Sequence, residues 1–244
     1  MRSRFIRTGL RLKAGALVWL LALAPAFAQA QALNCKVPQS LSAPVRPSPE
    51  SNVGMVETTG SLLAISWSPQ YCRNRLTSPR DKTQCSGANG RFGFILHGLW
   101  VEAAGRNDPQ FCAPATPVPE AELQRNFCMT PSAALMQHEW AKHGTCATDT
   151  PERYFEVARR FWTKLAFPNM DALSRKPLTV RQFKLAFAKA NRGLPESAIS
   201  VRTDRGGWLD EVMLCIGTKG EWRACPAEDR GAPPALNLRI WRGN

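Results

Sequence analysis

The 244-residue sequence has no internal repeat, no Cys-x-x-Cys pair and few histidines. Without a self-similar period it does not form a repeat array. Without Cys-x-x-Cys, neither a zinc knuckle nor a thioredoxin-like redox centre is indicated. The longest apolar run has fifteen residues, whereas a membrane-spanning helix needs roughly 18–20. The chain is 44% hydrophobic with 8 Trp and 11 Phe, which excludes a disordered protein.

The first thirty residues are typical of an export signal that is removed from the mature protein. Five basic residues and no acidic ones accompany an apolar run from Ala14 to Ala28, and small residues follow in Ala-x-Ala spacing. A retained N-terminal anchor is the alternative, but the run length and the cleavage spacing argue against it. No Arg-Arg pair marks the export route for folded proteins. We therefore expect a cleaved signal peptide at residues 1–30, one domain at residues 31–244, and a periplasmic or secreted protein with no membrane attachment.

The charge that remains after residues 1–30 is still basic, with 27 Lys+Arg against 19 Asp+Glu, or +8. The excess is concentrated between Pro151 and Arg205, with 12 basic residues against 5 acidic ones. A solvated helical surface explains such a distribution, and so does a polyanion partner, of which nucleic acid is the commonest. The charge alone leaves both interpretations open.

We expect the protein to be a monomer.

The eight cysteines predict four disulfides, because an exported chain folds in an oxidising compartment. Short loops indicate the pairs Cys72–Cys85 and Cys215–Cys225. Spacing does not pair the other four, which are Cys35, Cys112, Cys128 and Cys146. Nineteen Pro and 17 Gly indicate long loops, and disulfides stabilise such a chain by restricting its unfolded state.

The expected secondary structure runs in the order strands, helices, strands. Residues 31–60 are expected to be extended or poorly ordered, and residues 71–90 and 101–130 to form loops. Strands are expected at residues 61–67, 91–96, 197–203, 208–217 and 236–241. Helices are expected at residues 132–143 (begun by Thr130-Pro131), at 152–165 (begun by Thr150-Pro151), and from the Thr179-x-x-Gln182 capping box to Gly193. The order lacks the βα alternation of a doubly wound sheet, so we expect an α+β fold with a central antiparallel sheet flanked by helices and stabilised by disulfides.

The three histidines are His97, His138 and His143. His97 ends an expected buried strand in Phe94–Trp100 (FILHGLW) and precedes a glycine. A side chain at such a position can enter a cleft, although a lone histidine there is more often structural.

The other two histidines lie on one expected helix, in HEWAKHGTC from His138 to Cys146. At 100° per residue, His138, Glu139, Lys142 and His143 share one face about 140° wide. A random solvated face seldom places two of three histidines beside a glutamate and a lysine. We therefore expect this face to be functional.

A zinc hydrolase is a weak alternative. His138-Glu139 begins like H-E-x-x-H, but that motif needs the second histidine at i+4 so that both rings meet one zinc. Here His143 is at i+5 and position 142 is a lysine, a cation that is unfavourable in a zinc shell. Even with His97 as a third ligand, we expect no metal and no cofactor.

Two histidines and a fixed cation suit the cleavage of RNA. One histidine takes the proton of the 2′-OH as a base, and the other protonates the departing 5′-oxygen as an acid. Lys142 supplies positive charge where the phosphorane forms, and Glu139 orients a ring or holds the lysine. The need for a 2′-OH restricts the substrate to RNA.

Two blocks of the sequence resemble the ribonuclease T2 family of secreted acid ribonucleases. Phe94–Trp100 resembles the family segment F-x-I-H-G-L-W-P, and His138–Cys146 resembles H-E-W-x-K-H-G-T-C at all eight defined positions. Ser66–Cys72 and the Cys215–Cys225 loop also fit the family pattern. The resemblance spans roughly residues 61–226.

The resemblance implies a metal-independent endoribonuclease of low base specificity. It would cleave single-stranded RNA by transphosphorylation to a 2′,3′-cyclic phosphate and then form a 3′-phosphate. His143 would be the general base and His97 the general acid, with the roles exchanged in the second step. His138 would bind phosphate, and Glu139 and Lys142 would stabilise the transition state.

The resemblance has further implications for the surroundings of these residues. Trp100 would stack on a base, and Cys146 would pair with an upstream cysteine, for which we expect Cys112. Val101 stands where the family usually has proline, so we expect a looser loop around Trp100 and an altered base preference rather than lost catalysis.

Two alternatives to an active ribonuclease remain. A catalytically silent relative would bind RNA without cutting it, although the presence of both His97 and His143 argues against this. A secreted structural or toxin-like protein with an incidental histidine cluster would keep its activity after His143→Ala.

Overall fold

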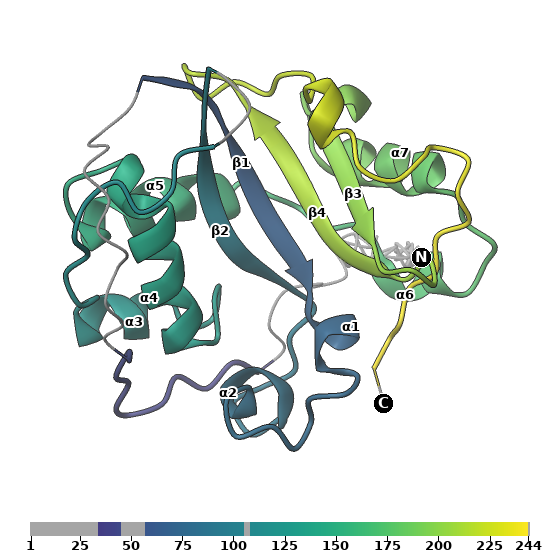
Figure 1. Ribbon diagram of the computed structural model, residues 1–244. Helices are drawn as coiled ribbons and strands as arrows, with labels where there is room; N and C mark the ends of the chain where they lie inside the picture. Colours follow the sequence, from purple (N-terminus) through teal and green to yellow (C-terminus); the bar gives the residue numbers. More distant parts are fainter. Residues whose placement is uncertain (1–33, 45–56, 105–107, 244) are drawn as a thin grey trace, which may run out of the picture.

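The computed structural model describes residues 34–44, 57–104 and 108–243, and a four-stranded antiparallel sheet lies at its centre (Figure 1). The strand order is β2-β1-β4-β3, and every neighbouring pair is antiparallel. The strands are β1 (Thr58–Trp67), β2 (Phe94–Ala103), β3 (Ile199–Thr203) and β4 (Leu209–Ile216). The expected α+β fold is confirmed.

Helices lie beside both edges of the sheet and at one end of it (Figure 1). Beside β2 lie α3 (Glu120–Asn126), α4 (Ala133–Lys142), the 3₁₀ helix η1 (Gly144–Cys146) and α5 (Pro151–Trp162). On the β3 side are α6 (Met170–Ser174) and α7 (Val180–Ala190), followed by η2 (Glu196–Ala198). At the end of β1 are α1 (Ser68–Cys72) and α2 (Lys82–Cys85), and η3 (Ala227–Asp229) follows β4. Within the described ranges, no helix combines the length and the apolarity needed to cross a membrane.

The two faces of β1 lead to different environments. Leu63, Ile65 and Trp67 belong to the main hydrophobic core, whereas Leu62 belongs to a small cluster with Met213. This alternation follows from the two-residue period of a strand. The residues between the apolar ones, such as Ser66, are therefore available for polar functions on the face away from the main core.

The helix starts agree with the sequence signals at two of three positions. The hydroxyl of Thr150 accepts from the Arg153 backbone N–H, and Thr179 forms its capping box with Gln182. The expected Thr130-Pro131 start of α4 is wrong, because Ser132 is the N-cap. Thr130 instead donates its hydroxyl to the carbonyl of Leu96 at 2.8 Å, so this residue ties the chain to β2.

The second strand is longer than expected and shifted along the chain. A strand at residues 91–96 and a loop from residue 101 were expected, but β2 continues to Ala103 and α3 lies at residues 120–126. Val101 pairs with Ser61 of β1 and is buried, so the expected loosening around Trp100 is not found. Leu99 bonds the Tyr154 hydroxyl through both its N–H and its carbonyl, so the Val101 N–H, two residues on, also faces away from β1, and a proline is compatible with this edge position.

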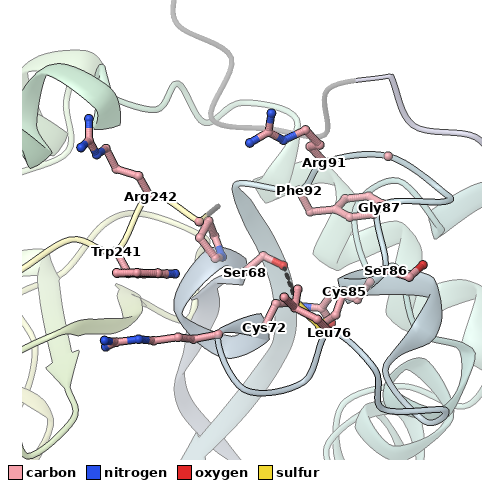
Figure 2. Close-up of a pocket in the computed structure, with 15 residues that line it drawn as sticks. Ser68, Cys72, Leu76, Cys85, Ser86, Gly87, Arg91, Phe92, Trp241 and Arg242 are labelled. Atoms are coloured by element: carbon pink, nitrogen blue, oxygen red, sulfur yellow. Dashed lines mark hydrogen bonds between the residues drawn. A yellow bond between two sulfur atoms is a disulfide. The ribbon is translucent and has the colours of Figure 1, made fainter.

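The C-terminal segment does not form the expected strand at residues 236–241. Isolated bridges join Asn237 to Thr179 and Arg239 to Trp208, outside the sheet. The carbonyl of Trp241 accepts a hydrogen bond from the Trp67 indole at 2.6 Å, which fixes the segment beside α1. Figure 2 shows Trp241 and Arg242 on one side of the cavity that results.

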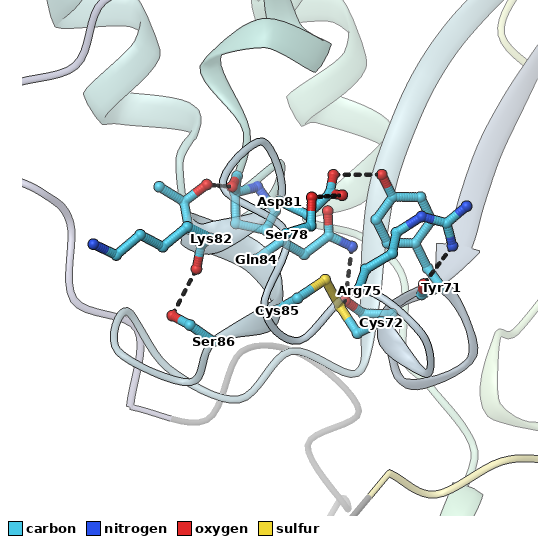
Figure 3. Close-up of a disulfide and its surroundings, with 12 residues drawn as sticks. Tyr71, Cys72, Arg75, Ser78, Asp81, Lys82, Gln84, Cys85 and Ser86 are labelled. Atoms are coloured by element: carbon cyan, nitrogen blue, oxygen red, sulfur yellow. Dashed lines mark hydrogen bonds between the residues drawn. A yellow bond between two sulfur atoms is a disulfide. The ribbon is translucent and has the colours of Figure 1, made fainter.

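Four disulfides join distant parts of the described chain. The expected pairs Cys72–Cys85, Cys215–Cys225 and Cys112–Cys146 are confirmed, and the fourth is Cys35–Cys128. Figure 3 shows Cys72–Cys85 joining α1 to α2, in a region expected to be a loop, where the Tyr71 hydroxyl donates to Asp81 at 2.7 Å.

The N-terminal described segment is attached to the domain. Cys35 is bonded to Cys128, and Leu41 is buried in the main core. Residues 34–44 are therefore better ordered than expected. The expected signal peptide at residues 1–30 and the stretch 45–56 lie outside the described residues.

Candidate active site

A β-bulge in β2 positions the first histidine. Leu96 pairs with Ile65 and Gly98 pairs with Ala64, which leaves His97 as the extra residue. Strict alternation would send side chains three residues apart to opposite faces. The extra residue cancels this effect, so His97 and Trp100 project from the same face. His97 was expected at the end of the strand, and it lies inside the strand instead.

Two carboxylates hold the His97 ring. Nδ1 lies 2.5 Å from Oε1 of Glu211, and Nε2 lies 3.4 Å from Oε1 of Glu139. The hydroxyl of Ser66 donates to the same Glu211 oxygen at 2.8 Å. Glu211 is on β4 and was missed in the sequence analysis, because 114 residues separate it from His97. The sequence signal that could have identified Glu211 is its position beside Asp210 at the start of an otherwise apolar strand.

The charge state of His97 follows from these contacts. Burial alone would lower its pKa, but the hydrogen bonds and negative charges of Glu139 and Glu211 outweigh that effect and raise the pKa to about 10. Burial raises the pKa of each glutamate in turn, and the contact with His97 more than reverses this. His97 is therefore an imidazolium at neutral pH, in contact with two carboxylates.

Trp100 lies between the two catalytic candidates. Its indole N–H donates to Oε2 of Glu139 at 2.7 Å. Its ring stacks on His143 with centroids 5.2 Å apart and an interplanar angle of 22°, and it meets His97 edge to face at 5.3 Å. His97, Glu139 and His143 therefore surround one aromatic ring, although they come from β2 and from the end of α4.

His143 has the opposite electrostatic environment. It is 3% exposed, and neither ring nitrogen has a hydrogen-bond partner among the described residues. Burial, together with the positive charges of Lys142, His138 and His97, lowers its pKa to about 4 against the opposing effect of Glu139. Between about pH 4 and pH 10, His143 is therefore neutral while His97 is protonated. Two titratable groups whose environments push their pKa values apart are the arrangement that acid–base catalysis requires.

The expected common face of the α4 residues is only partly formed. Glu139 and His143 are buried, whereas His138 is exposed and its ring meets Phe111 edge to face at 6.4 Å. The helix ends at Lys142, so His143 is its C-cap and does not follow helical spacing. Lys142 is half-buried, and its carbonyl accepts from the Phe111 backbone N–H at 2.8 Å.

A cavity of about 380 Å³ adjoins His97. Its walls include Ser66 and Glu211 from the sheet and Tyr71 and Arg75 from the α1–α2 region. Throughout the described part of the chain, no three His, Cys, Asp or Glu side chains are grouped to hold a metal ion.

The sequence matches the family model for the ribonuclease T2 family over residues 59–221. It is 34% identical over 148 residues to a probable ribonuclease of Haemophilus influenzae, with 54% of each chain covered. The chain thus spans about half the length of that relative. A ribonuclease of Aeromonas hydrophila is 30% identical over 169 residues, which cover 65% of this chain and 71% of the relative.

Solved structures share the fold. Trichomaglin, an S-like ribonuclease, has a TM-score of 0.60 at 19% identity, over 76% of this chain and 98% of trichomaglin. RNase NT in complex with 5′-AMP has a TM-score of 0.56 at 22% identity, over 76% and 98%. The family match covers well over half of the sequence and contains both histidine blocks. This protein therefore belongs to the ribonuclease T2 family.

Proposed function

We propose that this protein is a metal-independent endoribonuclease that cleaves single-stranded RNA through a 2′,3′-cyclic phosphate, with low base specificity. The observation that carries the proposal is the pair of histidines with opposite protonation states on either side of Trp100. Membership of the ribonuclease T2 family and the nucleotide bound by RNase NT on the same fold agree with it.

The two histidines divide the proton transfers. Neutral His143 takes the proton of the 2′-OH while the 2′-oxygen attacks phosphorus. The bond to the 5′-oxygen breaks, and that oxygen receives a proton from the His97 imidazolium. In the second step the roles exchange, so that His97 accepts a proton from water and His143 returns one to the 2′-oxygen. A base must be neutral and an acid protonated at the working pH, as these pKa values provide.

The charged neighbours of the two histidines orient the His97 ring and stabilise the phosphorane. Glu139 and Glu211 hold His97 in one orientation through both ring nitrogens. Lys142 supplies positive charge next to His143 for the phosphorane. His138 is exposed on α4, one residue before Glu139, and there it binds a phosphate of the RNA substrate.

Trp100 controls access to His143, the proposed general base. A general base must come within hydrogen-bond reach of its proton, but His143 is 3% exposed under the stacked indole. We infer that substrate binding displaces Trp100 from His143, after which its ring stacks on a base of the RNA. Stacking is tolerant of sequence, in keeping with low base specificity.

The cellular setting follows from the sequence and the disulfides. The leader-like residues 1–30 and four disulfides support a protein that works in the periplasm or outside the cell. We propose that it acts there as a monomer.

The test is product analysis on a short single-stranded RNA in excess EDTA. We expect fragments ending in 2′,3′-cyclic phosphate that turn slowly into 3′-phosphates. Loss of cleavage in EDTA, or 5′-phosphate products, would contradict the mechanism.

Two controls complete this experiment. His143→Ala and His97→Ala should each lose about 10²–10⁴ of the rate, the usual contribution of one acid or base. Wild-type protein that binds RNA without cleaving it between pH 4 and 8, with its disulfides intact, would instead identify a silent RNA-binding member.

A further inference from the structure

Two arginines stack on two tryptophans outside the catalytic cluster. The Arg73 guanidinium lies 4.3 Å from the ring centroid of Trp241 and 4.9 Å from that of Trp208. The Arg239 guanidinium lies 3.9 Å from the centroid of Trp208, and the two indoles meet edge to face at 5.8 Å. We call Arg73, Trp208, Arg239 and Trp241 the arginine–tryptophan cluster.

The two guanidiniums of this cluster have unused donors. In the described part of the chain, no ion pair and no side-chain hydrogen bond involves the guanidinium of Arg73 or Arg239. The neighbouring Arg242 differs, because it lies 3.5 Å from Asp171. The nearby Asp204 carboxylate accepts from Gln70 and from backbone N–H groups of its own turn. Each free guanidinium presents five N–H donors in a planar fork, which matches the oxygens of a phosphate.

Two hollows adjoin Trp241. One, of about 290 Å³, is bounded by Arg73, Phe92 and Trp241 (Figure 2). The other, of about 570 Å³, is bounded by Trp208, Arg239 and Trp241. Both indoles are only half-buried, and both arginines are exposed. The cluster therefore offers aromatic surface beside fixed positive charge, with room for planar groups.

The cluster is close to the catalytic cavity. Arg75 lines the cavity that contains His97, and it is two residues after Arg73, so their Cα atoms are at most about 7.6 Å apart. Trp208 comes immediately before β4, the strand that carries Glu211. The wall of the catalytic cavity and the cluster thus share the Tyr71–Arg75 segment, and Gln70 at its start donates to Asp204 of the turn that precedes Trp208.

We propose that the arginine–tryptophan cluster is a binding surface for the part of a single-stranded RNA that flanks the scissile bond. Arg73 and Arg239 bind two phosphates, and the tryptophans stack with bases. Stacking on indole holds each guanidinium in place, so less side-chain freedom is lost when a phosphate binds. Alternating phosphates and bases match alternating arginines and tryptophans. This inference rests on the proposed function, because it concerns the RNA cleaved at His97 and His143.

The test is the double variant Arg73→Gln/Arg239→Gln, assayed on a dinucleotide and on a single-stranded RNA 30-mer. We expect kcat/KM for the 30-mer to fall about tenfold, which corresponds to about 1.4 kcal/mol, and dinucleotide cleavage to stay unchanged. Binding of the 2′-deoxy 30-mer, which cannot be cleaved, should weaken in parallel. Its log–log salt slope should become about 1.4 smaller, at about 0.7 for each of two lost phosphate contacts.

A matched control removes the same charge elsewhere. Lys219 and Arg230 are exposed and follow the other end of β4, so Lys219→Gln/Arg230→Gln should leave both substrates and the 2′-deoxy 30-mer unaffected. Equal losses in the two double variants would overturn the inference in favour of a general charge effect.

Other outcomes separate this inference from the proposed function. Unchanged 30-mer cleavage and binding in the Arg73/Arg239 variant would refute the cluster as an RNA site. Unchanged RNA binding with lost binding to phosphatidylglycerol vesicles would assign the cluster to a lipid surface instead. A wild-type protein that does not cleave the dinucleotide would contradict the ribonuclease proposal, whereas the 2′-deoxy 30-mer would still test the cluster.

Discussion

Two histidines in this protein differ in pKa because their immediate neighbours differ. His97 has a carboxylate at each ring nitrogen, and its pKa is raised to about 10. His143 is buried under Trp100 without a hydrogen-bond partner among the described residues, and its pKa is lowered to about 4. The acid and base roles that we propose rest on this contrast, which residue type alone cannot show.

Glu211→Gln tests the origin of the His97 charge. The amide keeps the shape of the side chain but removes the negative charge at Nδ1, so the pKa of His97 should fall. We expect the alkaline limb of kcat/KM against pH to move to lower pH, while the acid limb, set by His143, stays in place. The pH profile of cleavage of a dinucleotide measures both limbs. Asp210→Asn is the matched control, because Asp210 lines the same cavity without bonding to His97. A lower kcat/KM at every pH, with both limbs at unchanged positions, would show that Glu211 is structural.

The bulge in β2 matters at the level of the element. By inserting His97 between Leu96 and Gly98, opposite the Ala64–Ile65 step of β1, it brings His97 and Trp100 to one face of the strand. Gly98 then lies directly under the Glu139 carboxylate. A side chain at position 98 would occupy the space through which Glu139 reaches both His97 and Trp100.

Gly98→Ala is therefore expected to damage catalysis more than folding. The added Cβ would collide with Oε2 of Glu139 and press on the Trp100 indole. We expect kcat to fall by about tenfold or more, because misplaced catalytic groups cost that much, with the far-ultraviolet circular dichroism retained. Val101→Pro, at an edge-strand position whose N–H faces away from β1, is the comparison variant and should leave kcat largely unchanged. Full activity in Gly98→Ala would contradict the positioning of Glu139 described here.

The pH dependence of stability is a property of the whole molecule. His143 has a folded pKa below its unfolded value near 6.5, so the unfolded state binds more protons between about pH 4 and 6.5. Stability should therefore decrease as pH falls through that range. His97 has a folded pKa above its unfolded value, so its contribution is complete below about pH 6.5 and is lost as pH rises toward about 10. Together they place a maximum of stability near pH 6.5.

Urea unfolding at a series of pH values measures this maximum. We expect His143→Gln to remove the decrease between pH 6.5 and 4 that is due to His143, while leaving the alkaline decrease intact. The carboxylates Glu139 and Glu211, whose folded pKa values are lowered, still lose their contribution below about pH 4.5 in the variant. An acid limb identical to that of the wild type would show that His143 is not neutral in the folded protein.

Much of the fold follows from local chemistry, and this part was predictable. The capping residues Thr150 and Thr179, the two short-loop disulfides and the order of elements depend on neighbours within about a dozen residues. Their free energies are decided by nearby backbone donors and by short loop closure, which the sequence displays directly. The histidine blocks were recognisable for the same reason.

The contacts that set the chemistry depend on long-range packing. Glu211 meets His97 across 114 residues, Cys35 meets Cys128 across 93, and Arg73 meets Trp241 from opposite ends of the domain. No local preference specifies such pairs, because many registers of the strands satisfy the same apolar alternation. The sheet order and the bulge at His97 select one of them. The sequence therefore determines which residue types the candidate site contains, and the assembled sheet determines which histidine carries the proton.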